Sequence, residues 1–363
     1  DESILEASNP EGIFTADNIG ESAYLLSNET SPTDNYEAKQ TIFGTYLKGE
    51  VVLTKNLKMM TGVRWETAFQ EVSTFKLLSP DEKDTVSLDK NSFLPAFSAT
   101  WQAKADQQFR FALSQTVNRP DFKELSEAPY IDPETRDLVR GNKKLQPATI
   151  SHADLRWEWY LTRFETFSVA TFYKKFDSPI ERVIRLGGGG VHTFSNAESA
   201  NIYGIEMQGR TWLSRLFGRS FSRFYVESNL ALINSSVDLG KSGSQLTTNN
   251  RPLQGQSPWL VNFTLAYENL VARAKASLLL NMSGERIVGV GTSGLPDSYQ
   301  QPVPQLDFVF SKEIYEGSQD KLKLKMKIKN ILDPEYITKQ EDKVTKRYRK
   351  GVSGSMTLEY KWK

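Results

Sequence analysis

The residues with the most obvious capacity for acid–base chemistry are the two histidines, His152 and His192. Ser151 precedes His152, which suggests a Ser–His–acid hydrolase. Adjacent residues of a strand point to opposite faces, however, so these two side chains would not meet. We expect His152 to lie on the polar face of its strand, where it would face a water-filled lumen or the rim of the sheet. Neither histidine has an obvious nucleophile within reach of its side chain, and we predict that the protein is not an enzyme.

His192 follows glycines 187–190, and a glycine-rich loop can cradle a phosphate. That function also requires a Lys-Ser or Lys-Thr pair and a helix after the glycines, which this segment lacks. The segment is more typical of a hairpin tip at a cell surface. His192 and three arginines at predicted loop or lumen positions are the candidate contacts for an anionic ligand; the arginines are Arg119, Arg140 and Arg251.

Metal and thiol chemistry is restricted by composition. The absence of cysteine excludes a disulfide framework, cysteine-ligated zinc, iron–sulfur clusters and thiol catalysis. Two histidines are too few for a histidine-rich metal site. The carboxylate pairs Asp132/Glu134 and Glu341/Asp342 lie in predicted loops, where oxygen ligands could bind calcium, although solvated loop charge is the commoner role. We predict no metal site and no cofactor.

The charge balance argues against nucleic acid as a partner. The chain has 45 Lys and Arg residues against 44 Asp and Glu residues, so no field of one sign surrounds it. The sequence KVTKRYRK at 343–350 is a local basic cluster. These residues would either contact lipopolysaccharide phosphates or form a charged rim at the mouth of the last hairpin. We favour the charged rim.

Strands, and not helices, must position these residues. At 321–329, apolar residues alternate with five lysines. A strand would place the two sets on opposite faces, whereas a helix would scatter the lysines around its circumference. The lysines are Lys321, Lys323, Lys325, Lys327 and Lys329. The same period of two indicates about thirteen strands, near 41–53, 57–72, 91–103, 108–118, 147–161, 165–177, 198–213, 221–237, 254–268, 271–287, 303–315, 320–333 and 346–362.

The length of these strands and of their connections indicates a membrane barrel. Many strands exceed the ~5–6 residues that are usual in soluble proteins. Short polar turns alternate with long links at 73–90, 119–146, 178–197, 238–253, 288–302 and 334–345. Outer-membrane barrels have this alternation, with short periplasmic turns and long extracellular loops. The mean hydropathy of −0.47, with no apolar run near ~18 residues, excludes helical membrane proteins but not such barrels.

Aromatic residues lie where a membrane barrel needs them. All seven tryptophans fall on or at the ends of predicted strands, as expected for girdles at the two membrane interfaces. We predict as interface aromatics Trp157, Trp159, Trp259, Tyr360 and Trp362. The five alternating lysines then face a water-filled lumen. A soluble β-core is the alternative, but it would have to bury those lysines without water or carboxylates.

Four segments together resemble a known family, the TonB-dependent outer-membrane receptors. In the order of that family, they are SQTVNRPDFKEL at 114–125 with its return through 130–135 and 141–147, NAE and YGIE within 196–206, GQSPW at 255–259, and KNILD at 329–333. The resemblance implies an all-β fold, a transmembrane antiparallel up-and-down β-barrel whose strands are similar to the C-terminal portion of a 22-stranded barrel.

Two features depart from the family pattern. Complete receptors hold a plug domain in the barrel, and we expect neither a plug nor a TonB box within these 363 residues. We expect residues 41–363 to be the C-terminal part of the barrel and residues 1–40 to be an extracellular loop or a strand remnant. The first four residues do not resemble a signal peptide. Second, Lys363 follows Trp362, although such barrels usually end on an aromatic residue.

The resemblance implies a receptor in the bacterial outer membrane that captures a scarce solute on its extracellular loops and passes it inward when TonB acts on the plug. Its expected partners are outer-membrane lipid and lipopolysaccharide, the TonB complex, a small solute and other protein chains. A passive porin-like channel, and a barrel for surface protein assembly or adhesion, are the alternatives. The sequence does not identify the solute, because selectivity resides in the loops.

Overall fold

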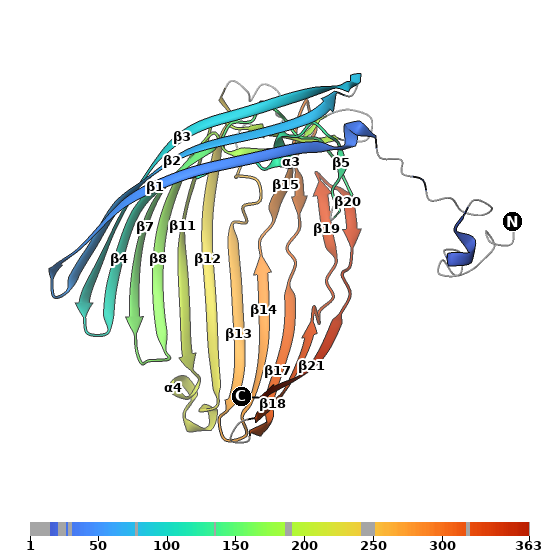
Figure 1. The fold of residues 1–363 in the computed structure, drawn as a ribbon. Coiled ribbons are helices and arrows are strands. Elements are labelled where there is room, and N and C mark those ends of the chain that lie inside the picture. The colour runs from blue at the N-terminus through green and yellow to red at the C-terminus, as the bar shows by residue number, and fades with distance from the viewer. Residues whose placement is uncertain are drawn as a thin grey trace.

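A single curved antiparallel sheet dominates the computed structural model, which describes residues 15–20, 27, 31–76, 79–133, 136–185, 191–240, 251–316 and 320–362. In this part of the chain thirteen strands pair in chain order, so the sheet runs up and down (Figure 1). They are β1 (Tyr36–Thr54), β2 (Leu57–Lys76), β3 (Ser79–Lys104), β4 (Gln107–Asn118), β7 (Ala148–Tyr160), β8 (Thr166–Asp177), β11 (Ser199–Trp212), β12 (Phe224–Asp238), β13 (Trp259–Asn269), β14 (Ala274–Ser283), β17 (Gln305–Glu316), β18 (Asp320–Lys329) and β21 (Ser353–Trp362). The predicted β-barrel architecture is confirmed.

The prediction of a long link at 73–90 is wrong. β2 and β3 continue through this segment as one long hairpin, in which Val72 pairs with Val86 and Thr74 with Asp84. Val72 is buried, and Val86 and Leu88 pack against its cluster. Eight Ser, Asp, Glu and Lys residues in 79–90 suggest a loop. Contacts with distant residues nevertheless stabilise the strands, and a local pattern does not contain those contacts.

Four of the predicted long links fold into a second sheet of their own. Its eight strands pair in the order β20-β19-β16-β15-β9-β10-β6-β5, and each link between barrel strands contributes two of them. They are β5 (Tyr130–Ile131), β6 (Leu138–Val139), β9 (Ile180–Arg185), β10 (Val191–Asn196), β15 (Arg286–Gly291), β16 (Ser298–Gln300), β19 (Tyr336–Gln340) and β20 (Lys343–Tyr348). The last predicted strand, 346–362, is therefore two strands, β20 and β21, in different sheets.

Helical segments are short; two of them precede β1 and the others lie between strands. They are η1 (Ala16–Asn18), η2 (Pro32–Asp34), α3 (Phe122–Leu125), α4 (Ser214–Phe217) and η3 (Arg219–Phe221). Asp121 begins α3 by accepting a hydrogen bond from the Lys123 backbone N–H at 3.1 Å, a usual N-cap. Among the described residues, no helix has the length and apolarity that a membrane-crossing helix requires.

The strand register divides the side chains of the barrel sheet between two faces. One face carries a row of polar side chains, in which Gln108 pairs with Glu158 and Glu158 with Ser168. The row continues on β12 and β13 with the paired Asn229 and Asn262. We call this the inner face, because the long links pack on it. Following the register to β18 puts the five alternating lysines on the inner face as well.

The opposite, outer face is apolar. Trp157 and Trp159 flank Glu158 in β7 and therefore point to this face, where their rings stack with centroids 6.3 Å apart. The register also assigns Trp259, Tyr360 and Trp362 to it. Met356 and Trp362 are 74% and 75% exposed, so the outer face has no protein covering over much of its area.

The apolar core is divided among small clusters at the links. Val72 on the inner face packs with Leu125 and Leu145 from the link between β4 and β7. Val183, Ile287 and Val290 form a second cluster within the sheet of links. The core therefore fixes the links to the barrel, whereas backbone pairing holds the barrel strands to one another.

Candidate binding site

A hollow of about 1360 Å³ lies between the second sheet and the inner face of the barrel. β9, β10, β15, β19 and β20 contribute side chains to it, and Asn281 and Gln305 contribute from the inner face. Its wall is rich in charge, with more cations than anions. The cations are Arg136, Arg182, Arg286, Lys346, Arg347 and Lys350, and the acids are Glu124, Asp132 and Asp137.

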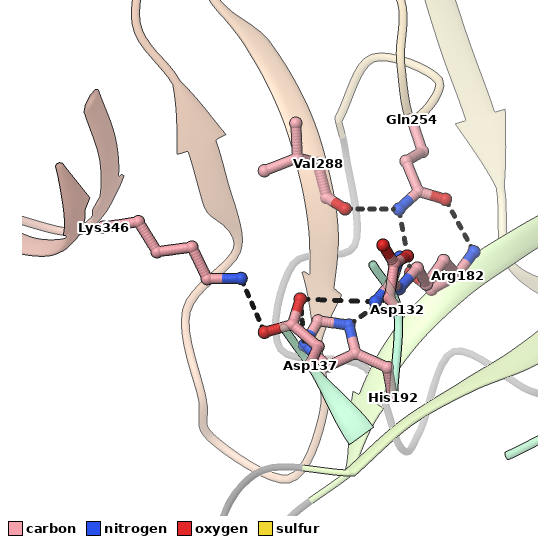
Figure 2. Close-up of polar contacts among 7 residues, drawn as sticks. All are labelled: Asp132, Asp137, Arg182, His192, Gln254, Val288 and Lys346. Atoms are coloured by element: carbon pink, nitrogen blue, oxygen red, sulfur yellow. Dashed lines mark hydrogen bonds and ion pairs between the residues drawn. The ribbon is translucent and has the colours of Figure 1, made fainter. Parts of the chain in front are cut away.

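Arg182 on β9 is the centre of a polar network in this hollow (Figure 2). Its Nη1 lies 2.9 Å from Asp132 Oδ2, and its Nη2 lies 3.2 Å from Asp137 Oδ2. Lys346 on β20 contacts the other oxygen of Asp137, with Nζ 2.5 Å from Oδ1. The two acids of the network are therefore paired with cations of the protein.

His192 completes the network from β10. Its Nδ1 accepts a hydrogen bond from Arg182 Nε at 3.0 Å, and its Nε2 lies 3.5 Å from Asp137 Oδ2. Burial, together with the Arg182 cation, lowers the pKa of His192 to about 4. The imidazole is therefore neutral near pH 7. Its described contacts are an arginine and a carboxylate and do not include a hydroxyl, so the geometry is that of an ion network and not of a catalytic triad.

Gln254 joins two strands of the second sheet. Its Oε1 accepts a hydrogen bond from the Arg182 backbone N–H at 2.6 Å, and its Nε2 donates to the carbonyls of Arg182 and Val288, each at 3.0 Å (Figure 2). This amide therefore extends the pairing between β9 and β15, which are directly paired at Val183 and Val290. Gln254 precedes the GQSPW motif, which indicated this part of the fold without indicating the contact.

Of the four candidate ligand contacts, His192 alone lines the hollow among the described residues. Arg251 forms a bidentate ion pair with Glu181, with N–O distances of 2.8 and 2.7 Å, and its side chain is 1% exposed. Arg119 Nη2 lies 2.6 Å from Glu66, and Arg140 Nη2 lies 3.6 Å from Glu127. We infer that these three arginines hold the links in place.

The other predicted positions fall at several places in the fold. Asp132 belongs to the Arg182 network, but Glu134 and glycines 187–190 lie outside the described residues. Glu341 and Asp342 occupy the exposed turn between β19 and β20. No group of three potential metal ligands occurs in the described part of the chain. His152 shares a hydrogen bond with Thr116 Oγ1 at 2.8 Å on the inner face.

The basic cluster at 343–350 has a location that the sequence did not indicate. It contributes Lys346, Arg347 and Lys350 to the wall of the hollow, so it faces the interior and not only a rim. Lys350 Nζ lies 4.5 Å from the centroid of the Tyr336 ring, which stacks on Tyr348 at 5.0 Å. On β18, Lys325 Nζ lies 2.6 Å from Glu359 Oε2.

Comparison with known proteins assigns the fold to a family. Residues 8–307 match the family model described as TonB dependent receptor-like, beta-barrel. No curated protein sequence matches the chain.

Solved structures of related architecture cover nearly the whole chain. The ferric-catecholate import receptor Fiu from K12 E. coli is 11% identical, with a TM-score of 0.59 over 87% of this chain and 44% of that one. The siderophore receptor PiuA from Acinetobacter baumannii is 12% identical, with a TM-score of 0.60 over 89% and 43%. The ferric yersiniabactin uptake receptor FyuA from Yersinia pestis is 15% identical, with a TM-score of 0.59 over 89% and 44%. The chain thus spans less than half the length of these structures.

Proposed function

The chain belongs to the TonB-dependent receptor family through its β-barrel domain, and on that premise we propose that it captures a solute in the hollow and releases it inward in an energised, TonB-dependent step. The observation that supports this function best is the hollow itself. Four links that start at the same end of the barrel form a single sheet above the inner face, and together they enclose a space large enough for a small solute.

We propose an anionic solute. Asp132 and Asp137 are paired with Arg182 and Lys346, and Glu124 accepts a hydrogen bond from the Asp121 backbone N–H. Arg286, by contrast, donates to the neutral Gln300 at 3.1 and 2.8 Å, and Lys350 lies over a tyrosine ring. A hollow whose cations exceed its acids attracts negative charge.

We propose the bacterial outer membrane as the location, with the outer face in contact with lipid and lipopolysaccharide. The uncovered apolar residues of that face support this location, because water would solvate them poorly. The predicted boundary at residue 41 moves to Tyr36, where β1 begins. We further propose that the chain from β1 onward is the C-terminal part of the barrel, that the residues before β1 form an extracellular loop or a strand remnant, and that TonB acts through a plug domain. The lysines of β18 would face that plug or the water of the lumen.

The test is uptake by cells that carry the intact receptor. Radiolabelled ferric citrate serves as an anionic iron chelate and cobalamin as a solute without net charge. We expect accumulation of the anionic probe, and loss of that accumulation when the TonB gene is deleted or the proton-motive force is collapsed. Uptake that persists in both conditions, together with steady ion conductance in a planar bilayer, would instead identify a passive channel.

A further inference from the structure

The link between β11 and β12, residues 213–223, differs from the other short connections of the barrel. Its sequence, LSRLFGRSFSR, contains α4 and η3, and arginines alternate in it with Leu216, Phe217 and Phe221. These three apolar side chains are 62%, 64% and 42% exposed. Figure 1 shows α4 at the end of the barrel sheet that carries the short turns, away from α3 and β5.

Aromatic rings continue from this link onto the outer face. The centroid distances are 5.7 Å from Phe217 to Phe221, 6.3 Å from Phe221 to Phe224, and 5.1 Å from Phe224 to Tyr267. Phe224 pairs with Tyr267 in the register, and both belong to the outer face. The link therefore extends the apolar outer face past the ends of the strands.

An ion pair holds the link in a fixed position. Arg215 donates to both carboxylate oxygens of Glu165, at 3.0 and 2.7 Å, and Thr211 Oγ1 donates to the same group at 2.8 Å. These hydrogen bonds lower the pKa of Glu165 to about 2. Gly218, with a φ of 86°, makes the turn between α4 and η3. The exposed rings are thus presented by a structured segment.

The turns at this end of the barrel differ in how much apolar surface they expose. The turn between β1 and β2 is polar and consists of Lys55 and Asn56. The turn after β13, near the link in the order of strands, instead exposes Leu270 and Val271 by 80% and 92%. The turn between β7 and β8 also exposes Phe164, by 63%, so exposed apolar residues occur in the turns from β7 to β14 at this end.

We propose that residues 213–223 anchor the barrel in the phospholipid leaflet at its short-turn end. The apolar side chains insert among acyl chains, while Arg219 and Arg223 lie at the level of the lipid phosphates. Alternation of arginines with aromatic and aliphatic residues suits such an interface. Continuity with the outer face identifies lipid as the occupant. The anchor rests on the proposed membrane location but is independent of the solute.

The test is spin-label accessibility in the intact receptor, reconstituted in vesicles of phosphatidylethanolamine and phosphatidylglycerol. The 363 residues contain no cysteine, so Phe217→Cys provides a single labelling site within them, once any cysteine elsewhere in the receptor is replaced. Lys55→Cys is the control in a polar turn at the same end, and Leu278→Cys is the control on the outer face. We expect oxygen to reach the labels at 217 and 278 better than a water-soluble nickel chelate does, and the reverse at 55.

Each other outcome has a separate meaning. A label at 217 that behaves like the label at 55, while the label at 278 reports lipid, overturns the anchor and leaves the proposed function intact. A label at 278 in water overturns the membrane location itself. A label at 217 shielded from both reagents shows that protein covers the link, which also overturns the anchor.

The arginines provide a second, independent measurement. In the Phe217→Cys background, Arg219→Gln with Arg223→Gln should move the label toward water. The ratio of immersed to exposed label should fall by about fivefold for each interfacial charge lost in anionic vesicles. In phosphatidylcholine vesicles the same substitutions should change the ratio less. An identical change in both kinds of vesicle would contradict a role for the arginines at anionic lipid.

Discussion

Lys346 and Asp137 are 209 positions apart in the sequence, yet their side chains meet at 2.5 Å. Lys346 lies on β20, at one end of the strand order in the second sheet, and Asp137 directly precedes β6, near the other end. The ion pair therefore brings together the two ends of the sheet that the links form. Because Asp137 also contacts Arg182, this one carboxylate connects three links of the barrel.

The first prediction concerns this carboxylate. Asp137→Asn keeps the size of the side chain but removes the charge shared by Lys346 and Arg182. We expect faster amide hydrogen exchange in β20 and β9, with no change in β12. Lys58→Gln, which breaks the exposed pair with Glu50 at the short-turn end, is the control and should leave all three strands unchanged. Unaltered exchange in Asp137→Asn would show that the pair does not stabilise the second sheet.

The second prediction is a pH dependence that arises from His192. Its pKa lies near 4 in the folded protein and near 6.5 in the unfolded chain, so between these values the unfolded state binds more protons. The His192 contribution to stability therefore rises with pH from about 4 to 6.5 and is constant above. We expect the protection factors of the β10 amides, which are corrected for the slower intrinsic exchange at low pH, to fall when the pH falls from about 7 to 5. His192→Asn should reduce this dependence, and an equal dependence in both proteins would exclude His192 as its source.

The third prediction concerns the buried pair of Glu181 and Arg251, with side chains 3% and 1% exposed. Glu181→Gln should lower the free energy of unfolding by about 3–5 kcal/mol, because it leaves a buried guanidinium without its counter-charge. The double variant Glu181→Leu with Arg251→Met should lose less, since no charge then remains buried. Urea unfolding of the three proteins in detergent would measure both values, and a double variant that loses more than the single one would contradict this account.

The fourth prediction distinguishes lipid from water on the two faces of β14. Leu278 on the outer face and Leu279 on the inner face are 39% and 37% exposed, so their surroundings differ mainly in which face they occupy. Leu278→Lys should destabilise the protein in vesicles by about 2–4 kcal/mol, whereas Leu279→Lys should have little effect. Equal losses in the two variants would contradict contact between lipid and the outer face.

The fifth prediction tests the charge of the solute site. Arg286→Gln combined with Lys350→Gln removes two cations from the hollow that have no described carboxylate partner in the hydrogen bonds and ion pairs of the fold. If ferric citrate binds there, its Kd should rise about tenfold or more, because charge-assisted hydrogen bonds contribute at least ~1.5 kcal/mol. Lys58→Gln is again the control. Equal affinity in the two proteins would place the anionic solute elsewhere.

The sequence predicted the barrel well and the site poorly, for one physical reason. Barrel strands such as β18 alternate apolar and charged residues with period two. The sequence of each strand therefore predicts which of its residues lie on each face. Arg182 and Asp137 come from different links, and no local period relates them. No recognisable motif surrounds Asp137 to indicate its role. Gln254 adjoins a recognisable motif, but its role depends on Val288, 34 positions away.

The four links have a consequence for how a solute enters the hollow. Because their strands pair with one another, no single link can swing aside without breaking backbone hydrogen bonds with its neighbours. Opening is therefore a collective event, similar to the local unfolding of one cooperative unit. Transplanting one link from another receptor would break the same hydrogen bonds, so a change of selectivity by exchange of segments requires the whole set of eight strands to move together.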